Sequence, residues 1–81
     1  MSTQGSIKIK NVSGAAYTIV ELGGIVVIPD QEIIDLLDPL LPQYYADWED
    51  ANRLVTVLTT AKLYQDIKDG HVIVTENVPP E

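Results

Sequence analysis

The chain has 81 residues, of which 46% are hydrophobic, and a formal net charge of −7. This length allows one domain with a modest core, and such domains bury only about 60% of the surface that their unfolded chains expose. The sequence has no cysteine, no clustered basic stripe and no apolar run near the roughly 20 residues of a membrane helix, so we expect no disulfide, no direct nucleic-acid binding and no membrane span. The large hydrophobic share indicates that part of the apolar surface is buried against another subunit.

The chain begins with a small polar arm, residues 1–6, which we expect to be flexible. Apolar and basic side chains then alternate, and this period of two predicts a half-buried strand. The apolar positions of this strand are Ile7, Ile9 and Val12. Turn-forming residues follow at 11–14, where Gly14 supplies conformational freedom, so the strand is predicted to end there.

Two glycines, Gly23 and Gly24, separate two runs of β-forming residues at 17–22 and 25–28. Glycine tolerates the positive φ of hairpin turns, so this pattern predicts an antiparallel hairpin with a two-residue turn. The register that such a turn predicts pairs Leu22 with Ile25 and Val20 with Val27. The second run has no polar residue before Pro29, which is typical of a strand covered on both faces.

The segment from residue 32 to residue 46 is ambiguous between strand, helix and loop. Its first part alternates apolar pairs with acids, a pattern that allows a short strand or one to two helical turns, and we favour a strand at 32–35. Further on, Pro42 forbids a regular helix across 39–42, so a loop that carries leucines is predicted there.

Helical signals dominate the C-terminal half of the chain. Asp47 fits the N-cap of a helix that runs to about Leu58, with acids in its first turn. The elements predicted after it are a helix from residue 59 or 60 to 68, a left-handed cap at Gly70, a strand at 71–76 and an extended tail at 77–81. Residues 7–76 are therefore predicted to form a small single α+β domain with an antiparallel sheet, two short helices and a C-terminal strand.

The residue chemistry does not indicate a catalytic or metal site. His71 is the one histidine, and we interpret it as a polar residue at a strand entrance beside a helix C-terminus. The acids at 47–50 and 30–32 lack the glycine spacing of a calcium loop, so we interpret them as helix-start and loop acids. We therefore expect no enzymatic activity, no cofactor and no metal.

Large apolar side chains gather in the middle of the chain next to Pro42. These interface candidates are Leu40, Leu41, Tyr44, Tyr45 and Trp48. Two interpretations are open for them: the rings close the end of a small sheet as core, or part of them anchors a protein interface, where Tyr and Trp are enriched.

Several short motifs of this chain resemble those of small structural proteins of tailed bacteriophages. The motifs are Ile-Lys-Asn-Val-Ser-Gly at 9–14, Tyr-Thr-Ile at 17–19, Glu-Leu-Gly at 21–23, Ile28, and the run from Leu63 to Val74. The resemblance covers most of residues 7–76, and the segment 39–58 departs from it by being longer and more aromatic. In that group, such a module attaches decoration, neck or fibre components to the virion.

The resemblance implies a non-enzymatic virion protein, made in the host cytoplasm, that docks onto capsid, neck or tail-fibre subunits as copies in a symmetric homo-oligomer. A rival hypothesis is a small acidic inhibitor or mimic that binds a basic site on a host protein. An inhibitor of this kind needs contiguous acids on one face, whereas the acids here are dispersed from Glu21 to Glu76. This dispersion of the acids favours the hypothesis of a virion protein.

Overall fold

The computed structural model describes residues 5–20, 23–24, 26–38, 40–41 and 47–80. The elements of this part of the chain are β1 (Ser6–Asn11), β2 (Tyr17–Ile19), β3 (Val26–Ile28), β4 (Ile33–Asp35), α1 (Trp48–Thr56), α2 (Lys62–Asp69) and β5 (Val72–Val78). A three-stranded antiparallel sheet has the order β4-β1-β5, and β2 and β3 form a separate two-stranded sheet. This architecture confirms the predicted small α+β domain.

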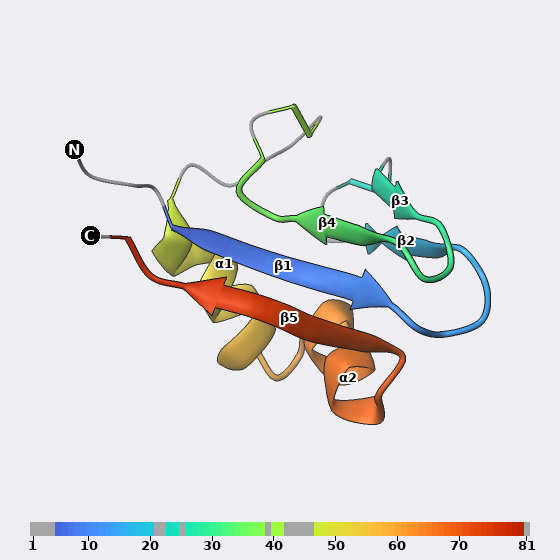
Figure 1. Ribbon diagram of the computed structural model, residues 1–81. Coiled ribbons are helices and arrows are strands. Elements are labelled where there is room, and N and C mark those ends of the chain that lie inside the picture. The colour runs from blue at the N-terminus through green and yellow to red at the C-terminus, as the bar shows by residue number, and fades with distance from the viewer. Residues whose placement is uncertain (1–4, 21–22, 25, 39, 42–46, 81) are drawn as a thin grey trace.

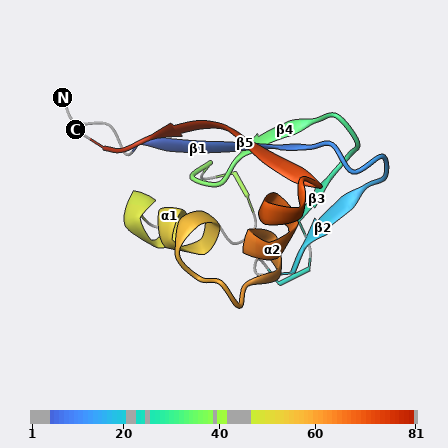
Figure 2. The same ribbon diagram turned by 90° about the horizontal axis from the view of Figure 1, so that it is seen from below.

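The domain has two layers (Figure 1). Both helices lie against the same face of the three-stranded sheet, and the β2–β3 hairpin stands at one end of the molecule (Figure 2). The core lies between the sheet, the helices and the hairpin. The buried hydrophobic residues that form it are Ile7, Ile9, Tyr17, Ile19, Val26, Ile28, Leu36, Leu37, Ala51, Leu54, Val55, Leu63 and Val72.

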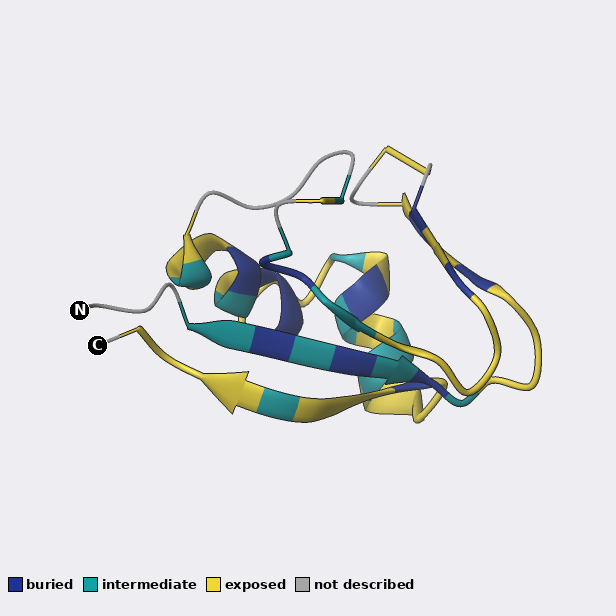
Figure 3. Cartoon of the chain, turned by 45° about the horizontal axis from the view of Figure 1, so that its top comes forward, coloured by how far each residue is buried: buried dark blue, intermediate teal, exposed yellow. Residues whose placement is uncertain are grey.

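β1 alternates buried and half-buried side chains along its whole length (Figure 3). Ile7 and Ile9 point into the core, as predicted. The third inward position, however, belongs to Asn11 and not to Val12, which lies beyond the end of the strand and is half-buried. The prediction for Val12 was wrong because the turn starts one residue earlier than the apolar pattern suggests.

The Asn11 side chain is fully buried and forms hydrogen bonds with both of its polar atoms. Its Nδ2 donates to the carbonyl oxygens of Ala15 (2.6 Å) and Ile28 (2.9 Å). Its Oδ1 accepts from the backbone N–H (3.0 Å) and the hydroxyl (2.7 Å) of Ser13. The amide thus holds the end of β1, the loop after it and the end of β3 together, and it replaces the hydrogen bonds to water that burial removes.

The backbone around Asn11 extends this junction to two further segments. The Asn11 N–H donates to the Glu32 carbonyl (3.1 Å), and the Asn11 carbonyl accepts from the Gln31 N–H (2.8 Å). The N–H of Val12 donates to the carbonyl of His71 (3.0 Å), just before β5. Both strands that flank β1 are therefore tied to it at this end of the sheet.

The hairpin around Gly23 and Gly24 exists, and both glycines have positive φ (79° and 75°). Its turn is not the predicted two-residue turn, because the last described pair is Ile19–Val26 and residues 20–25 separate its members. Its register differs from the prediction, because Thr18, not Val20, pairs with Val27; the other predicted pair, Leu22 with Ile25, lies outside the described residues. The observed partners are Tyr17–Ile28, Thr18–Val27 and Ile19–Val26. A shift of two residues leaves every side chain on its original face, so the alternation of apolar residues does not distinguish the two registers.

β3 is not covered on both faces, contrary to the prediction. Val26 and Ile28 are buried, but Val27 between them is 49% exposed. β3 pairs with β2 alone in the described sheet, and the pair packs one face on the core. An apolar run therefore did not indicate a central strand here, because Val27 lies on the solvent face.

The ambiguous segment forms a short strand, β4, followed by a turn. Leu36 and Leu37 are buried in that turn, where the N–H of Leu36 donates to the Ile7 carbonyl (2.9 Å). The Asp35 carboxylate accepts from the N–H of Leu37 (2.9 Å), which fixes the turn. The strand favoured for 32–35 is confirmed for Ile33–Asp35, and residues 39 and 42–46 lie outside the described part.

Both predicted helix caps are confirmed. The Asp47 side chain accepts from the N–H of Asp50 (2.9 Å) at the start of α1, and Gly70 has φ 85° at the end of α2. α1 ends at Thr56, before the predicted Leu58, which is 43% exposed. α2 begins at Lys62, later than predicted.

The first and last strands extend beyond their predicted limits. Ser6, which was assigned to the arm, pairs with Val78, which was assigned to the tail. A Cβ built on Gly5, whose φ is +79°, would lie 2.6 Å from the Val78 carbonyl oxygen and 3.0 Å from both the Pro80 nitrogen and Trp48 Cδ1. The two ends of the described chain therefore pack against each other beside the start of α1.

Asn11→Ala should lower the free energy of unfolding by about 2–3 kcal/mol, because it removes the side-chain donor of the buried Ile28 carbonyl and the acceptor of the Ser13 N–H. Ser13→Ala, the matched control, removes a hydroxyl whose contacts lie nearer the surface and should cost under about 1 kcal/mol. Urea denaturation of both variants measures the difference. Equal losses would show that the Asn11 amide is not the centre of this junction.

Gly5→Ala should destabilise the domain more than Gly14→Ala. Both glycines have positive φ, so both variants incur a left-handed strain of about 1–2 kcal/mol. A Cβ at Gly14 meets nothing within 4 Å, whereas one at Gly5 clashes with backbone. Thermal melting followed by circular dichroism compares the two, and a Gly5 variant that melts no lower than the Gly14 variant contradicts the close packing of the chain ends.

Candidate functional site

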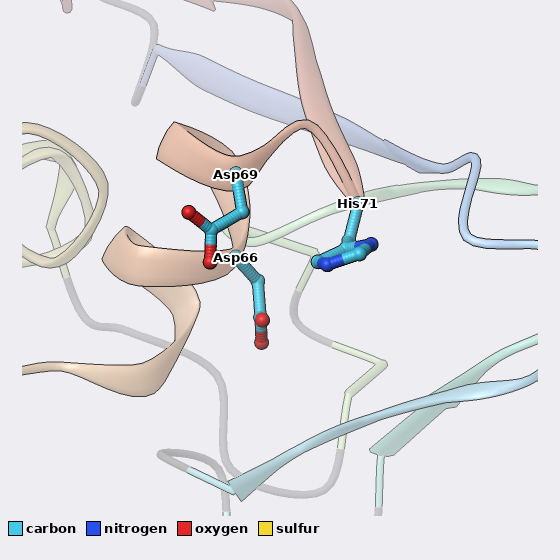
Figure 4. Close-up of side chains that lie close together, drawn as sticks. All are labelled: Asp66, Asp69 and His71. Carbon is cyan, nitrogen blue, oxygen red and sulfur yellow. The ribbon is translucent and has the colours of Figure 1, made fainter.

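Two carboxylates and an imidazole meet at the end of α2 (Figure 4). One ligand atom each from Asp66, Asp69 and His71 lies within 4.8 Å of the other two. The two aspartates are three residues apart and so share a helix face. After the left-handed Gly70, the N–H of His71 donates to the Asp66 carbonyl (2.9 Å), which places the histidine beside them.

This cluster was not predicted from the sequence, although the Gly70 cap that builds it was. From the sequence, His71 was interpreted as a polar residue at a strand entrance, and the acids considered as possible metal ligands were those at 47–50 and 30–32. In the structure, Asp47 caps α1, and Asp30 accepts from the N–H of Gly14 (3.0 Å), so these acids have local backbone roles. The signal that could have found the cluster is the spacing of two acids and a histidine around a left-handed glycine.

The Asp66 carboxylate also binds β2 and the first turn of its own helix. Its Oδ2 accepts from the Tyr17 hydroxyl (2.5 Å) and from Lys62 Nζ (2.7 Å). Lys62 Nζ lies 5.5 Å from the centroid of the Tyr17 ring, within the range of a cation–π contact. Tyr17 is a buried core residue, so this network joins the hairpin to α2.

These contacts change the acidity of Asp66. Burial raises the pKa of its carboxyl, but the hydrogen bonds from Lys62 and Tyr17, together with the positive charges of Lys62 and His71, outweigh burial and hold the pKa below its ordinary value. The ionised form of Asp66 is therefore the form that the fold stabilises.

An imidazole and two carboxylates are a donor set that suits several divalent cations. In this cluster, however, the Lys62 ammonium already lies against Asp66 and would repel a cation that approached the same carboxylate. The His71 imidazole also lies at the C-terminus of α2, beside the negative end of the helix dipole. We assign Asp66 a structural role, the attachment of the hairpin to α2.

The interface candidates of the sequence do not come together as one described surface. Tyr44 and Tyr45 lie outside the described residues, Leu41 and Trp48 are half-buried against the core, and Leu40 is 88% exposed. Trp48 Nε1 donates to Asn77 Oδ1 (2.9 Å). Trp48 thus packs on the core with its polar edge bonded to β5, whereas Leu40 points into solvent.

The face of the three-stranded sheet opposite the helices is a second candidate surface, which we call the outer face. Its residues, placed by the alternation of the strands and their register, are Ser6, Lys8, Lys10, Ile33, Asp35, Ile73, Glu76 and Val78. Three of them, Ile33, Ile73 and Val78, are exposed large hydrophobics. The outer face therefore combines apolar side chains with both signs of charge.

Within the outer face, Glu76 bonds to two other residues of the same face. Its carboxylate accepts from the Ser6 hydroxyl (2.6 Å) and lies 3.4 Å from Lys8 Nζ. The hydrogen bond from Ser6, followed by the charge of Lys8, lowers the pKa of Glu76. The salt bridges of the described residues leave Lys10 without an acidic partner.

Comparison of this chain with protein-family models, with curated proteins and with solved structures gives no match. Among the described residues, no helix is both long enough and apolar enough to span a membrane.

Asp66→Asn should reduce stability near neutral pH by about 1.5–3 kcal/mol, the range for a hydrogen bond to a charged group. A carboxyl whose pKa is lowered by folding stabilises the fold above its unfolded pKa, and this contribution is lost as the pH falls through the folded pKa. The difference in stability between wild type and Asp66→Asn should therefore become smaller at pH values below 3.8, the ordinary pKa of an aspartate. Thermal melting of both proteins from pH 7 down to pH 2.5 measures this difference.

Asp69→Asn is the matched control for this prediction, since Asp69 is exposed and removing a negative charge at a helix C-terminus is not unfavourable. We expect Asp69→Asn and His71→Ala to melt close to wild type. If both lowered the melting temperature as much as Asp66→Asn, and a chelator did the same to wild type, the cluster would be a metal site and its structural assignment wrong.

Proposed function

We propose that this chain is a non-enzymatic structural protein of a tailed-bacteriophage virion. In this role it docks onto capsid, neck or tail-fibre subunits as one of several copies in a symmetric assembly. The proposal combines the motif resemblance with the surface of the domain, and the motif Asn-Val-Ser-Gly at 11–14 forms the junction that holds the strands together.

The observation that carries the docking role is the amount of large apolar side chain left in solvent. The exposed large hydrophobics among the described residues are Val20, Val27, Ile33, Leu40, Val57, Leu58, Ile73, Val74 and Val78. A small acidic domain that leaves so many of them outside its core is expected to cover some of them with a partner. Leu40, at 88%, is the most exposed of these and precedes the segment with the tyrosines.

The distribution of acids favours docking over the rival role of an acidic inhibitor. Three of the described acids pair with bases, and these pairs lie on separate elements: Glu76 with Lys8 on the sheet, and Asp50 and Asp66 with bases on the two helices. A mimic of a polyanion is expected to leave its acids unpaired on one face, because its partner must neutralise them. The three paired acids lie on the sheet and on both helices, and they do not follow that pattern.

Mass spectrometry of purified phage particles tests the proposal directly, and the chain should be present at a fixed ratio to the capsid subunit. Leu40→Ser should lower this ratio at least severalfold while leaving the melting temperature within about 2 °C of wild type, since an exposed side chain adds little to the isolated fold. Val27→Ser, an exposed control on the hairpin, should leave both quantities near wild type.

One outcome would overturn the proposed function, and others would overturn the assignment of Leu40 to the docking site. Absence of the chain from particles, with co-purification of a basic host protein, would favour the inhibitor. Normal incorporation of Leu40→Ser would place the contact elsewhere, and loss of stability in that variant would assign Leu40 to the core.

A further inference from the structure

We propose that the open edge of β5 binds an extended segment of a partner protein as an additional antiparallel strand. The segment is β-branched in its middle and carries a basic residue at each end. This inference rests on the proposed function for the identity of the partner, a neighbouring virion subunit. It adds to the Leu40 contact a second surface, which holds such a subunit through its backbone.

β5 offers the longer of the two edges of the three-stranded sheet (Figure 1). It is the longest strand in the described part of the chain, and β1 is its one neighbour in that sheet. The opposite edge, β4, is shorter and ends at Asp35, whose carboxylate accepts from the N–H groups of Ile7 (3.3 Å) and Leu37 (2.9 Å). The edge of β5 is therefore the better place for an added strand.

The register determines which backbone groups of β5 point away from the sheet. The carbonyl of His71 accepts from the N–H of Val12 (3.0 Å), so His71 turns this group toward β1. Bonded and non-bonded residues alternate along an antiparallel pair, and the backbone groups of Val72 and Val74 therefore point outward. Asn11, the β1 partner of Val72, accordingly uses its own N–H and carbonyl on the β4 side. Among the described residues, no backbone bond outside the strands involves Val72 or Val74.

The side chains of this edge also suit a strand as the partner. Residues 72–75 are uncharged and all β-branched, without the Lys, Pro or inward charge that protects many natural edges. Ile73 on the outer face is 41% exposed. Val74 pairs with the buried Ile9, which places it on the helix side, and it is still 36% exposed. Apolar side chains are thus left in solvent on both faces of the edge, where a neighbouring strand covers them.

α2 supports the position of the added strand from the helix side. The helix packs against β5, and Figure 2 shows it beneath the first part of that strand. A helix with its side chains is about 10–12 Å wide, so α2 reaches about 5–6 Å to each side of its axis. A strand added to the sheet lies about 4.8 Å from β5. The helix-facing side chains of the segment therefore contact α2 instead of water.

The same helix excludes a second copy of this chain as the occupant. Two copies paired through β5 place these strands about 4.8 Å apart, and the α2 helices beneath them come to a similar spacing. Packed helices need about 8–10 Å between their axes. A single extended segment brings no helix of its own, so it fits where a second copy clashes.

The charges around the edge determine the ends of the segment. The chain carries −7, which favours a basic partner over an acidic one. The uncharged residues 72–75 lie between Asp69, at the end of α2, and Glu76. Asp69 is exposed and takes part in none of the salt bridges of the described residues. A segment with a Lys or Arg at each end places one base near each of these acids.

A β-bulge limits the length of the pairing. The register of β5 with β1 shifts between Lys8 and Ile9, so Thr75 is an extra residue that interrupts the regular edge. Val72 and Val74 then supply roughly four backbone hydrogen bonds to the segment. For an isolated segment we expect a dissociation constant of about 0.1–1 mM. In an assembly of several copies, multivalency strengthens such a contact.

The test uses the purified chain and a synthetic peptide of the proposed chemistry, acetyl-Lys-Val-Thr-Val-Thr-Val-Lys-amide. At about 2 mM peptide, solvent exchange of the Val72 and Val74 N–H groups, followed by NMR, should slow about three- to twentyfold. Exchange of the Ile33 N–H, which points outward on β4 by the same alternation, should not change. The same peptide with N-methyl groups on its three central residues keeps the charge but loses the central donors, and it should have no effect.

A pair of matched variants tests the place of binding. Ile73→Lys should weaken binding of the peptide about fivefold or more, because it removes an apolar contact and repels the basic ends. Ile33→Lys makes the same change on the same face beside β4 and should stay within about twofold of wild type. Both isoleucines are exposed (41% and 50%), so circular dichroism should show that both variants are folded.

Several results would overturn the proposal. Unchanged exchange at Val72 and Val74 would do so, and so would equal weakening by the two lysine variants or equal protection by the N-methylated peptide. Self-association that Ile73→Lys abolishes would assign the edge to a second copy instead. Detection of the chain in purified particles is independent of these results. A chain that is incorporated but does not bind the peptide would remove the edge contact and leave the proposed function standing.

Discussion

The structure depends on the complete satisfaction of one buried amide. Asn11 occupies a core position at the end of β1, where an unpaired polar group would cost on the order of 1–3 kcal/mol. Its side chain avoids that cost by bonding to the loop after β1 and to the end of β3, while its backbone bonds to the connection that leads into β4. Several segments distant in sequence must therefore be in place together, which makes this junction cooperative.

The junction also determines how the α2 cluster is built. The loop that Asn11 holds leads directly into β2, and so it positions Tyr17 over the first turn of α2. There the tyrosine hydroxyl and the Lys62 ammonium meet on the carboxylate of Asp66. The hairpin is thus fixed to the body by buried apolar side chains, by the amide at its base and by a charged hydrogen bond at its side, and these contacts come from different parts of the sequence.

Local signals were sufficient for the caps and turns, because Asp47 and Gly70 act on backbone groups only a few residues away. The hairpin was recognised for the same reason, but not its register, since a two-residue shift preserves the side chains on each face. Long-range contacts could not be predicted from the sequence. The residues next to Asn11 do not distinguish it from an exposed asparagine in a turn. The assembly of Asp66 with Tyr17 likewise requires knowing that the Tyr17 side chain of β2 reaches α2.

The proximity of Gly5 to Val78 and Pro80 has a topological consequence. Because the chain enters and leaves the domain at the same pole, its described ends can be joined by a short linker without stretching either strand. Circular permutation with a new opening in the exposed connection between the helices, at Thr59, is compatible with this geometry. For the same reason the domain can be carried as an insert within a surface loop of another protein, with the β2–β3 hairpin at the far end pointing away from its host.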